Sequence, residues 1–102
     1  MKVLFICNQN KNRSKTAEKI FNKKFKTKSA GLYNGNLVNK EFLIWSDIVF
    51  VMEEKQRAEI GRRFPKQYLI KKIISLNIPD IYSYDQPELI EILKLKMKDF
   101  LR

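Results

Sequence analysis

The residues best suited to chemistry lie together near the start of the sequence. The only cysteine, Cys7, stands six positions before Arg13, and Ser14 follows directly. An ionised thiol is a nucleophile, and a guanidinium group can donate two parallel hydrogen bonds to an oxyanion such as phosphate. Polar residues fill the interval between the two: Asn8, Gln9, Asn10, Lys11 and Asn12. This pattern predicts nucleophilic attack by a cysteine on a bound phosphate group.

The segments on either side of this stretch are suited to hold a phosphate-binding loop. Residues 3–6, Val-Leu-Phe-Ile, form a continuous apolar run that predicts a buried strand. Residues 14–25 predict a helix whose apolar face consists of Ala17, Ile20, Phe21 and Phe25. The backbone N–H groups of the loop and the positive end of the helix dipole would converge between these elements. We therefore expect the thiol at the mouth of this site to lose its proton easily.

Each residue of the loop has an expected role. Cys7 would attack phosphorus, while the backbone N–H groups of residues 8–13 would bind the equatorial oxygens, where charge accumulates. Arg13 would clamp two of those oxygens, a geometry that lysine cannot match. Ser14 can donate its hydroxyl to the thiolate, and it can also cap the helix. Asn10 suits a position that needs positive φ or a side-chain bridge across the loop.

A carboxylic acid is also required, to protonate the departing oxygen and then to activate water. Asp80 is the best candidate because it follows the last predicted strand, and ligands in α/β folds bind beyond the carboxyl ends of the strands. Asp85 competes with it, but a helix-capping role already explains Asp85. Asp47 precedes a strand and would lie at the wrong end of the sheet.

The rest of the chain alternates between predicted strands and helices. We expect strands at residues 27–30, 48–52 and 72–76, and helices at residues 39–45, 53–63 and from Pro87 onward. Asn39 is a possible cap, Ala58 and Ile60 are weak apolar anchors, and Pro65 should end or restart a helix. This alternation predicts an α/β fold in which a small parallel four-stranded sheet is flanked by helices in three layers.

The last helix is predicted to begin with a capping box. Asp85 and Glu88 have the required spacing, and Pro87 fits the first helical turn. The buried stripe of this helix would consist of Leu89, Leu93, Met97 and Phe100, with Ile90 and Leu101 beside them.

Length and composition limit the classes of function. The 102 residues, 44% of them hydrophobic, are expected to form a single domain over residues 1–102. One cysteine excludes an internal disulfide, and without histidine no Cys–His pair can form, so we expect no metal or other cofactor. The N-terminus enters a strand at once, and no apolar run is long enough to span a bilayer. We therefore expect a cytoplasmic protein without a membrane partner, where a lone thiol stays reduced.

Charge leaves a second class of function open. The formal net charge is +10, and residues 1–28 contain nine lysines and arginines against one glutamate, a net +8. This surface could steer acidic substrates toward the loop, or it could be an ordinary solvated face. The alternative to an enzyme is a non-catalytic phosphate- or nucleic-acid-binding module that uses the same loop. No interleaved aromatic platform for single strands is visible, so specific nucleic-acid binding is not expected.

These motifs resemble the low-molecular-weight protein tyrosine phosphatase family. The resemblance rests on residues 3–7 with Asn10, Arg13 and Ser14, on residues 17–18, and on residues 29–31, 47–52 and 78–82, in the family's order. It implies that Cys7 is the nucleophile, Arg13 the phosphate clamp, Ser14 the partner of the thiolate and Asp80 the general acid. Tyr82 resembles an aromatic residue that flanks the substrate ring, although an ordinary packing role explains it nearly as well.

The activity implied by the resemblance is hydrolysis of phosphate esters through a phosphocysteine intermediate. The partner would be a phosphoprotein or a small phosphate ester, and we expect a monomer or a weak homodimer. Arsenate reduction, which related folds perform, would need an external thiol because the chain has no second cysteine.

Several positions depart from the family pattern. The chain is shorter between Gly31 and Asp47, where the family has extra helical structure. Ile81 stands where the family usually has proline, and Asn12 stands where many members have a second cysteine. Lys11 replaces a small or apolar residue that lines the pocket. These departures concern the identity of the substrate more than the type of reaction.

Overall fold

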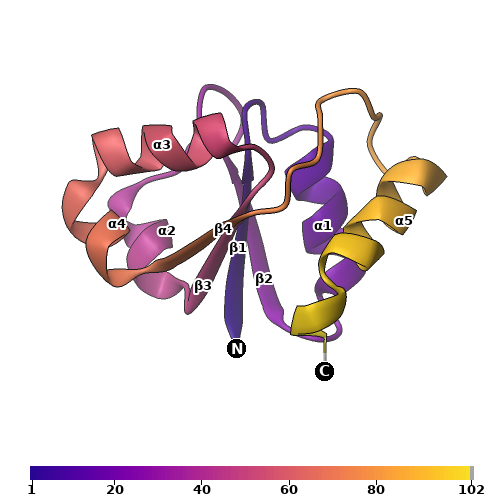
Figure 1. The fold of residues 1–102 in the computed structure, drawn as a ribbon, viewed down its shortest axis with the longest axis horizontal. Helices are drawn as coiled ribbons and strands as arrows, with labels where there is room; N and C mark the ends of the chain where they lie inside the picture. The colour runs from indigo at the N-terminus through magenta and orange to yellow at the C-terminus, as the bar shows by residue number, and fades with distance from the viewer. Residues whose placement is uncertain (102) are drawn as a thin grey trace.

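A parallel four-stranded sheet forms the centre of the computed structural model, which describes residues 1–101 (Figure 1). The strands are β1 (Lys2–Cys7), β2 (Lys26–Gly31), β3 (Ile48–Val51) and β4 (Lys72–Ser75), in the order β2-β1-β3-β4. The helices are α1 (Arg13–Phe21), α2 (Lys40–Trp45), α3 (Glu54–Arg63), α4 (Pro65–Ile70) and α5 (Pro87–Lys96), followed by a short 3₁₀ helix (Lys98–Phe100). The predicted α/β class and its four strands are confirmed.

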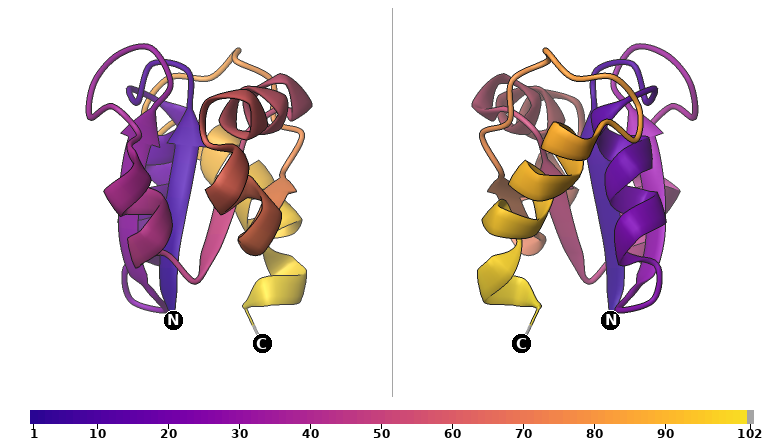
Figure 2. Two further views of the ribbon diagram at one scale, coloured as in Figure 1. Left: turned by 90° about the vertical axis from the view of Figure 1, so that its left-hand side faces the viewer. Right: turned by 90° about the vertical axis from the view of Figure 1, so that its right-hand side faces the viewer.

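Helices cover both faces of the sheet (Figures 1 and 2). α1 and α5 lie on one face, and α2, α3 and α4 lie on the other. The side chains of β1 alternate between the two resulting cores, with Val3, Phe5 and Cys7 on the α1 side and Leu4 and Ile6 opposite. A central parallel strand has no solvent-facing side, which explains the continuous apolar run in the sequence.

The end of β1 lies where the chain reverses its direction across the sheet. Cys7 pairs with Gly31 of β2, and Ile6 pairs with Val51 of β3. The chain passes from β1 to β2 on one side, and then to β3 and β4 on the other. Ligands of open α/β sheets bind in the crevice outside the strand ends at such a point. Cys7 therefore borders the crevice where a ligand is expected.

The boundaries of α1 differ from the prediction. Its N-cap is Asn12, so Ser14 lies inside the helix and does not cap it. The helix ends at Phe21, and the half-buried Phe25 packs against the core from the following loop. Ser14 is thereby placed on the first turn, with its side chain fully buried next to β1.

The starts of the middle helices were predicted well. Asn39 caps α2, its side chain accepting a hydrogen bond from the N–H of Phe42 at 2.8 Å, and Pro65 begins α4. The prediction that Ala58 anchors α3 was wrong, because Ala58 is exposed, whereas the other predicted anchor, Ile60, is fully buried. The two residues are only two positions apart and therefore cannot share one helical face.

The predicted capping box of α5 does not form. The N-cap is Gln86, and Asp85 adopts a left-handed conformation with φ of 60° while its carboxylate pairs with Lys19 at 2.7 Å. Pro87 does occupy the first turn, and the apolar stripe is fully buried at Leu89, Leu93 and Met97. No helix within the described part of the chain combines the length and apolar character needed to cross a membrane.

Candidate active site

A small polar cavity opens at the carboxyl end of β1. It has a volume of about 50 Å³ and is lined by Cys7, Gln9, Lys11, Asn12, Arg13 and Asp80. The sequence suggested a thiol at the mouth of the site. Cys7 is only 2% exposed, however, so its thiol lies at the floor. The cavity therefore has room for at least a small ion.

The loop that surrounds this cavity presents unpaired hydrogen-bond donors. Among residues 1–101, no protein acceptor receives a hydrogen bond from the backbone N–H groups of residues 9–12. The loop is held instead through its carbonyls, since those of Cys7 and Asn8 accept from the N–H groups of Leu32 and Tyr33 at 3.0 and 2.9 Å. Free N–H groups next to the N-terminus of α1 are the donors that a bound oxyanion requires.

Asn10 supports the loop from beneath. It adopts a left-handed conformation with φ of 51°, and its buried side chain donates to Ser14 Oγ at 2.9 Å and to Ser29 Oγ at 3.0 Å. Its Oδ1 accepts from the backbone N–H of Asn36 at 3.0 Å. Positive φ and the side-chain bridge, offered as alternatives by the sequence, are both present.

The same network directs the hydroxyl of Ser14. Ser14 Oγ lies 3.1 Å from Cys7 Sγ and already accepts a hydrogen bond from Asn10. A hydroxyl that accepts from one side keeps its own proton for the other. Ser14 is thus placed to donate to the sulfur of Cys7 when that sulfur is ionised.

The turn after β2 packs closely on the loop, which the sequence did not reveal. Gly35 has φ of 73°, and a Cβ at this position would lie 2.7 Å from Cβ of Asn10. Only glycine combines this backbone conformation with such a close approach. The Asn-Gly pattern predicted a turn, but its contact with the site depends on the tertiary structure.

Arg13 brings the ends of three strands together. Its guanidinium is 1% exposed, and Nη1 donates to the carbonyl of Ile78 at 2.7 Å and pairs with Glu53 Oε2 at 3.1 Å. Its Nε lies 3.7 Å from Asp80 Oδ1. A buried guanidinium needs such partners, and they also fix the plane of the group beside Cys7. Sequence reasoning missed Glu53, although its position two residues after the end of β3 placed it at the right end of the sheet.

The structure gathers most of the predicted site residues but separates one of them. Cys7, Arg13 and Asp80 line one cavity, as expected for residues that follow neighbouring parallel strands. Asp80 is half exposed and also lines a second cavity. Tyr82 is half-buried against the core beside α1 and α5, and it lines neither of these two cavities.

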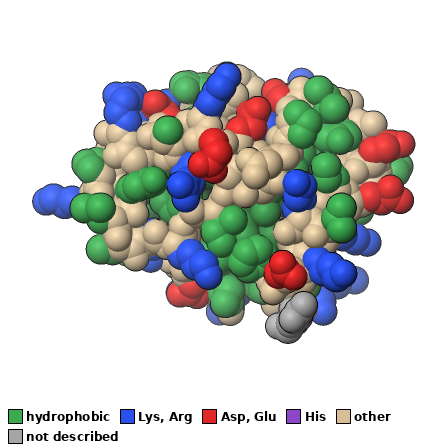
Figure 3. Space-filling model, in the orientation of Figure 1, with side chains coloured by type: hydrophobic (Ala, Val, Ile, Leu, Met, Phe, Trp, Pro, Cys, Tyr) green, Lys and Arg blue, Asp and Glu red, His purple; other side chains and the backbone are tan. Residues whose placement is uncertain are grey.

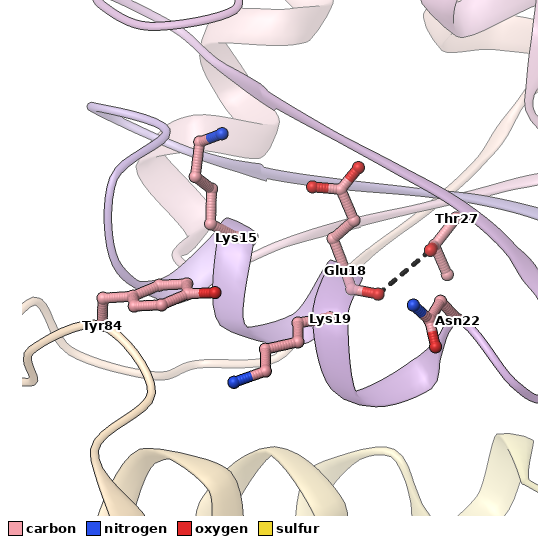
Figure 4. Close-up of a pocket in the computed structure, with 6 residues that line it drawn as sticks. All are labelled: Lys15, Glu18, Lys19, Asn22, Thr27 and Tyr84. Atoms are coloured by element: carbon pink, nitrogen blue, oxygen red, sulfur yellow. Dashed lines mark hydrogen bonds between the residues drawn. The ribbon is translucent and has the colours of Figure 1, made fainter.

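A larger cavity lies on the outer side of α1 but lacks a catalytic constellation (Figure 4). It measures about 360 Å³ and is lined by Lys15, Glu18, Lys19, Asn22, Thr27 and Tyr84. Figure 4 shows the ammonium groups of Lys15 and Lys19 pointing apart, while the Thr27 hydroxyl donates to the carbonyl of Glu18 at 3.0 Å. No thiol lines it, so the smaller cavity is the candidate active site. Within residues 1–101, no three His, Cys, Asp or Glu side chains are grouped to hold a metal ion.

Comparison with known proteins identifies the fold. No protein-family model and no curated protein sequence matches the chain. The tyrosine phosphatase Wzb from Escherichia coli K30, solved with phosphate, superposes with a TM-score of 0.80 at 19% identity, over 98% of this chain and 95% of that one. The low-molecular-weight protein tyrosine phosphatase from T. tengcongensis gives 0.77 at 20% identity, over 96% and 93%.

A third solved structure of the same fold is named for a different activity. The YwlE arginine phosphatase from Geobacillus stearothermophilus superposes with a TM-score of 0.68 at 21% identity, over 96% of this chain and 84% of that one. At such identities the likeness concerns the fold. This protein has the fold of the low-molecular-weight protein tyrosine phosphatases, as its sequence motifs predicted.

Proposed function

We propose that this protein is a metal-independent phosphomonoesterase that works through a phosphocysteine intermediate. The observation that carries the proposal is the cavity shared by Cys7, Arg13 and Asp80, next to the unpaired N–H groups of residues 9–12. A nucleophile, a cation, an acid and oxyanion donors are thus placed around a space the size of a small ion. The phosphatase activities named for solved structures of the same fold support this assignment.

In the first step, the thiolate of Cys7 attacks phosphorus from the floor of the cavity. The P–S bond forms as the bond between phosphorus and the ester oxygen breaks, and Asp80 gives its proton to the departing oxygen. Arg13 and the loop N–H groups bind the equatorial oxygens, whose charge increases in the transition state. Ser14 stabilises the thiolate before attack by donating a hydrogen bond from its hydroxyl to the sulfur.

In the second step, Asp80 acts as a base. Its carboxylate takes a proton from water, the resulting oxygen nucleophile attacks phosphorus, and the P–S bond breaks. Inorganic phosphate leaves and the thiolate of Cys7 is restored. Asp80 suits both steps because half of its surface is open to solvent while it borders the cavity.

The proposed substrates are phosphate esters similar to phosphotyrosine. The two activities named for structural neighbours, on tyrosine and on arginine, differ in the charge of the leaving group. Lys11 lines the cavity, and within residues 1–101 no carboxylate pairs with it. An unpaired ammonium beside the phosphate would repel the guanidinium of a phosphoarginine, so a neutral or anionic leaving group fits better.

Hydrolysis of phenyl phosphate in the presence of chelator tests the proposal. We expect turnover by the native protein, none by Cys7→Ser, and a kcat lowered on the order of 100-fold or more by Asp80→Asn. Asp47→Asn is the matched control, because Asp47 lies at the opposite end of the sheet, where its carboxylate accepts from the N–H of Lys2. Undiminished turnover by Cys7→Ser would rule out the mechanism.

A further inference from the structure

An apolar cavity opens at the end of the sheet opposite to Cys7, where the strands begin. Its volume is about 240 Å³. Figure 1 shows this end of the sheet close to the short 3₁₀ helix, Lys98–Phe100. We propose that the cavity binds a small carboxylate, whose apolar body lies inside it and whose acid group pairs with Lys72. This binding site goes beyond the proposed phosphatase function and does not depend on it.

Hydrocarbon side chains from four separate parts of the chain form the walls of the cavity. They come from the start of the chain with β1, from the loop after α1, from β3 and from the 3₁₀ helix: Met1, Val3, Phe25, Ile48, Phe50 and Phe100. Phe100 packs edge to face on Phe50 with ring centroids 5.0 Å apart, and Phe50 stacks on Phe5 at 5.7 Å. These ring contacts hold two of the walls in place, so a ligand has little to order when it binds.

The size of the cavity sets the size of its ligand. An apolar cavity of about 150 Å³ holds benzene, which has six carbons. At about 240 Å³, this cavity has room for an apolar body of about six to eight carbons. Water gains few hydrogen bonds from hydrocarbon walls, whereas a hydrocarbon body is stabilised by leaving water for such a space. The walls therefore select a ligand with a short apolar body.

The charges at the rim select the head group. Lysines begin three of the four strands, namely Lys2, Lys26 and Lys72. Asp47 precedes the fourth strand, which leaves a net charge of +2 among these four residues. The Asp47 carboxylate already accepts from the backbone N–H of Lys2 at 2.8 Å. Lys72 lines the cavity, and within residues 1–101 no carboxylate pairs with it. A carboxylate at the rim would thus find its partner in Lys72.

The apolar cavity is separate from the candidate active site. Val3 precedes Cys7 by four residues on β1, which corresponds to about 13 Å along an extended strand. Within residues 1–101, no side chain lines both the apolar cavity and the cavity that contains Cys7. Binding of the carboxylate can therefore be measured without turnover and without a phosphate group.

Three probes with the same six-carbon chain test the site: hexanoate, hexanol and hexylammonium. NMR titration of the Ile48 methyl signals gives a Kd for each probe. In the native protein hexanoate should bind about threefold more tightly than hexanol at low salt, the usual order for an exposed ion pair. Hexylammonium should bind more weakly than hexanol. Butanoate should bind about 15-fold more weakly than hexanoate, because each buried CH₂ group changes Kd about fourfold.

Lys72→Gln separates the head group from the apolar body. This variant should lose the preference for hexanoate over hexanol, while its affinity for hexanol stays unchanged. Lys55→Gln is the matched control, because Lys55 lies in the first turn of α3 at the other end of the sheet, and it should keep the preference. Both lysines are exposed, so neither substitution disturbs the core.

The position of the probe can be determined in the native protein without any substitution. Protons of bound hexanoate should give nuclear Overhauser contacts to the rings of Phe25 and Phe100, which line the cavity. Absence of saturable binding, Overhauser contacts to other parts of the molecule, or a preference for hexylammonium would overturn the proposal. Retention of the hexanoate preference in Lys72→Gln would overturn the role of Lys72 and with it the proposed site.

Discussion

At the scale of single residues, the site depends on a chain of buried hydrogen bonds. Cys7 contacts Ser14, Ser14 accepts from Asn10, and Asn10 also reaches Ser29, whose hydroxyl donates to Glu18 at 2.7 Å. Asn10 donates to both serine hydroxyls, and Ser29 passes its own proton to Glu18. Ser14 therefore keeps its proton for the sulfur once the thiol is ionised.

Removal of the Ser14 hydroxyl should slow chemistry without weakening binding. A hydrogen bond to a charged group contributes about 1.5–3 kcal/mol, so Ser14→Ala should lower kcat on the order of 10- to 100-fold. KM should change little, because Ser14 does not line the cavity. Steady-state kinetics on phenyl phosphate measure both. Ser46→Ala is the control, a buried serine that donates to the Leu43 carbonyl at 2.9 Å before β3. An unchanged kcat in Ser14→Ala would contradict the role.

The left-handed conformation of Asn10 predicts an unusual order of variants. Asn10→Ala loses the side-chain bridge and also places a Cβ at φ of 51°. Asn10→Gly loses the bridge but relieves the backbone, and this conformation costs about 1–2 kcal/mol for residues other than glycine. Unfolding in urea should therefore show Asn10→Gly to be more stable than Asn10→Ala by about 1 kcal/mol. Equal stability would mean that the backbone carries no strain.

At the scale of elements, α1 does more than present the loop, since it also anchors the segment that contains Asp80. Thr16 Oγ1 accepts from the N–H of Asp85 at 2.9 Å, and Lys19 pairs with the Asp85 carboxylate at 2.7 Å. Lys19 also lies 5.7 Å from the ring of Tyr84. The other end of the segment is held by Arg13 at the carbonyl of Ile78. Asp80, the proposed general acid, is thus carried between two fixed points.

Loss of the Lys19 contact should loosen this segment. Lys19→Gln removes an exposed ion pair, so amide exchange of residues 81–85 should become about two- to fivefold faster. Lys23→Gln, on an exposed lysine beyond the helix, should leave it unchanged. The hydrogen bond to Asp85 raises the pKa of Lys19 above its usual 10.5. The contact therefore stabilises fully below pH 10.5 and is lost as the pH rises through the raised value. Unchanged exchange in Lys19→Gln would argue against the anchor.

The last turn of α3 provides a pH test at the acidic end. Hydrogen bonds from Arg62 and then Arg63 lower the pKa of Glu59 to about 2. A lowered carboxyl pKa gives stability that is present above the ordinary value of 4.5 and disappears as the pH falls toward 2. The Tm difference between the native protein and Glu59→Gln should close over this range. Glu91→Gln, on the exposed face of α5, should show no such trend. A gap at pH 2 as wide as the gap at pH 5 would contradict the pairing.

At the scale of the whole molecule, the net charge of +10 could serve either to steer acidic substrates or to bind nucleic acid. The distribution of the basic side chains over the surface bears on this choice. On the face shown in Figure 3, basic side chains are dispersed among acidic and apolar ones and do not form one stripe. On this face, dispersed charge can attract a dianionic substrate from a distance but gives no fixed footprint for a nucleic acid.

The salt dependence of turnover and binding follows from this distribution. Between about 20 and 150 mM salt the screening length falls to about 8 Å, so kcat/KM for a phosphate dianion should fall several-fold while kcat stays constant. Binding to duplex DNA should vanish by about 150 mM. Stopped assays and fluorescence titration measure the two effects. DNA affinity that persists at this salt, together with absent turnover, would favour the non-catalytic module.

Much of the molecule was determined by short-range patterns in the sequence. The apolar runs of β1 and β3 require burial on both faces, and this requirement alone predicts a central parallel sheet with helices on either side. Parallel strands bring their carboxyl ends to one edge, so Cys7, Arg13 and Asp80 could be assigned to a common crevice before any coordinates were known. The resemblance of the loop to a known family added the expected role of each.

Tertiary structure alone decided the features that depend on contacts between distant segments. Sequence spacing assigned Asp85 to a capping box, but Lys19 and Thr16 of another helix compete for it, and its backbone turns left-handed. Glu53 beside Arg13, Gly35 beneath Asn10 and Tyr33 over Arg63 are likewise pairs without any fixed spacing. Periodicity reports which residues are buried, whereas partner choice depends on how packed elements meet in space, and no local pattern encodes that.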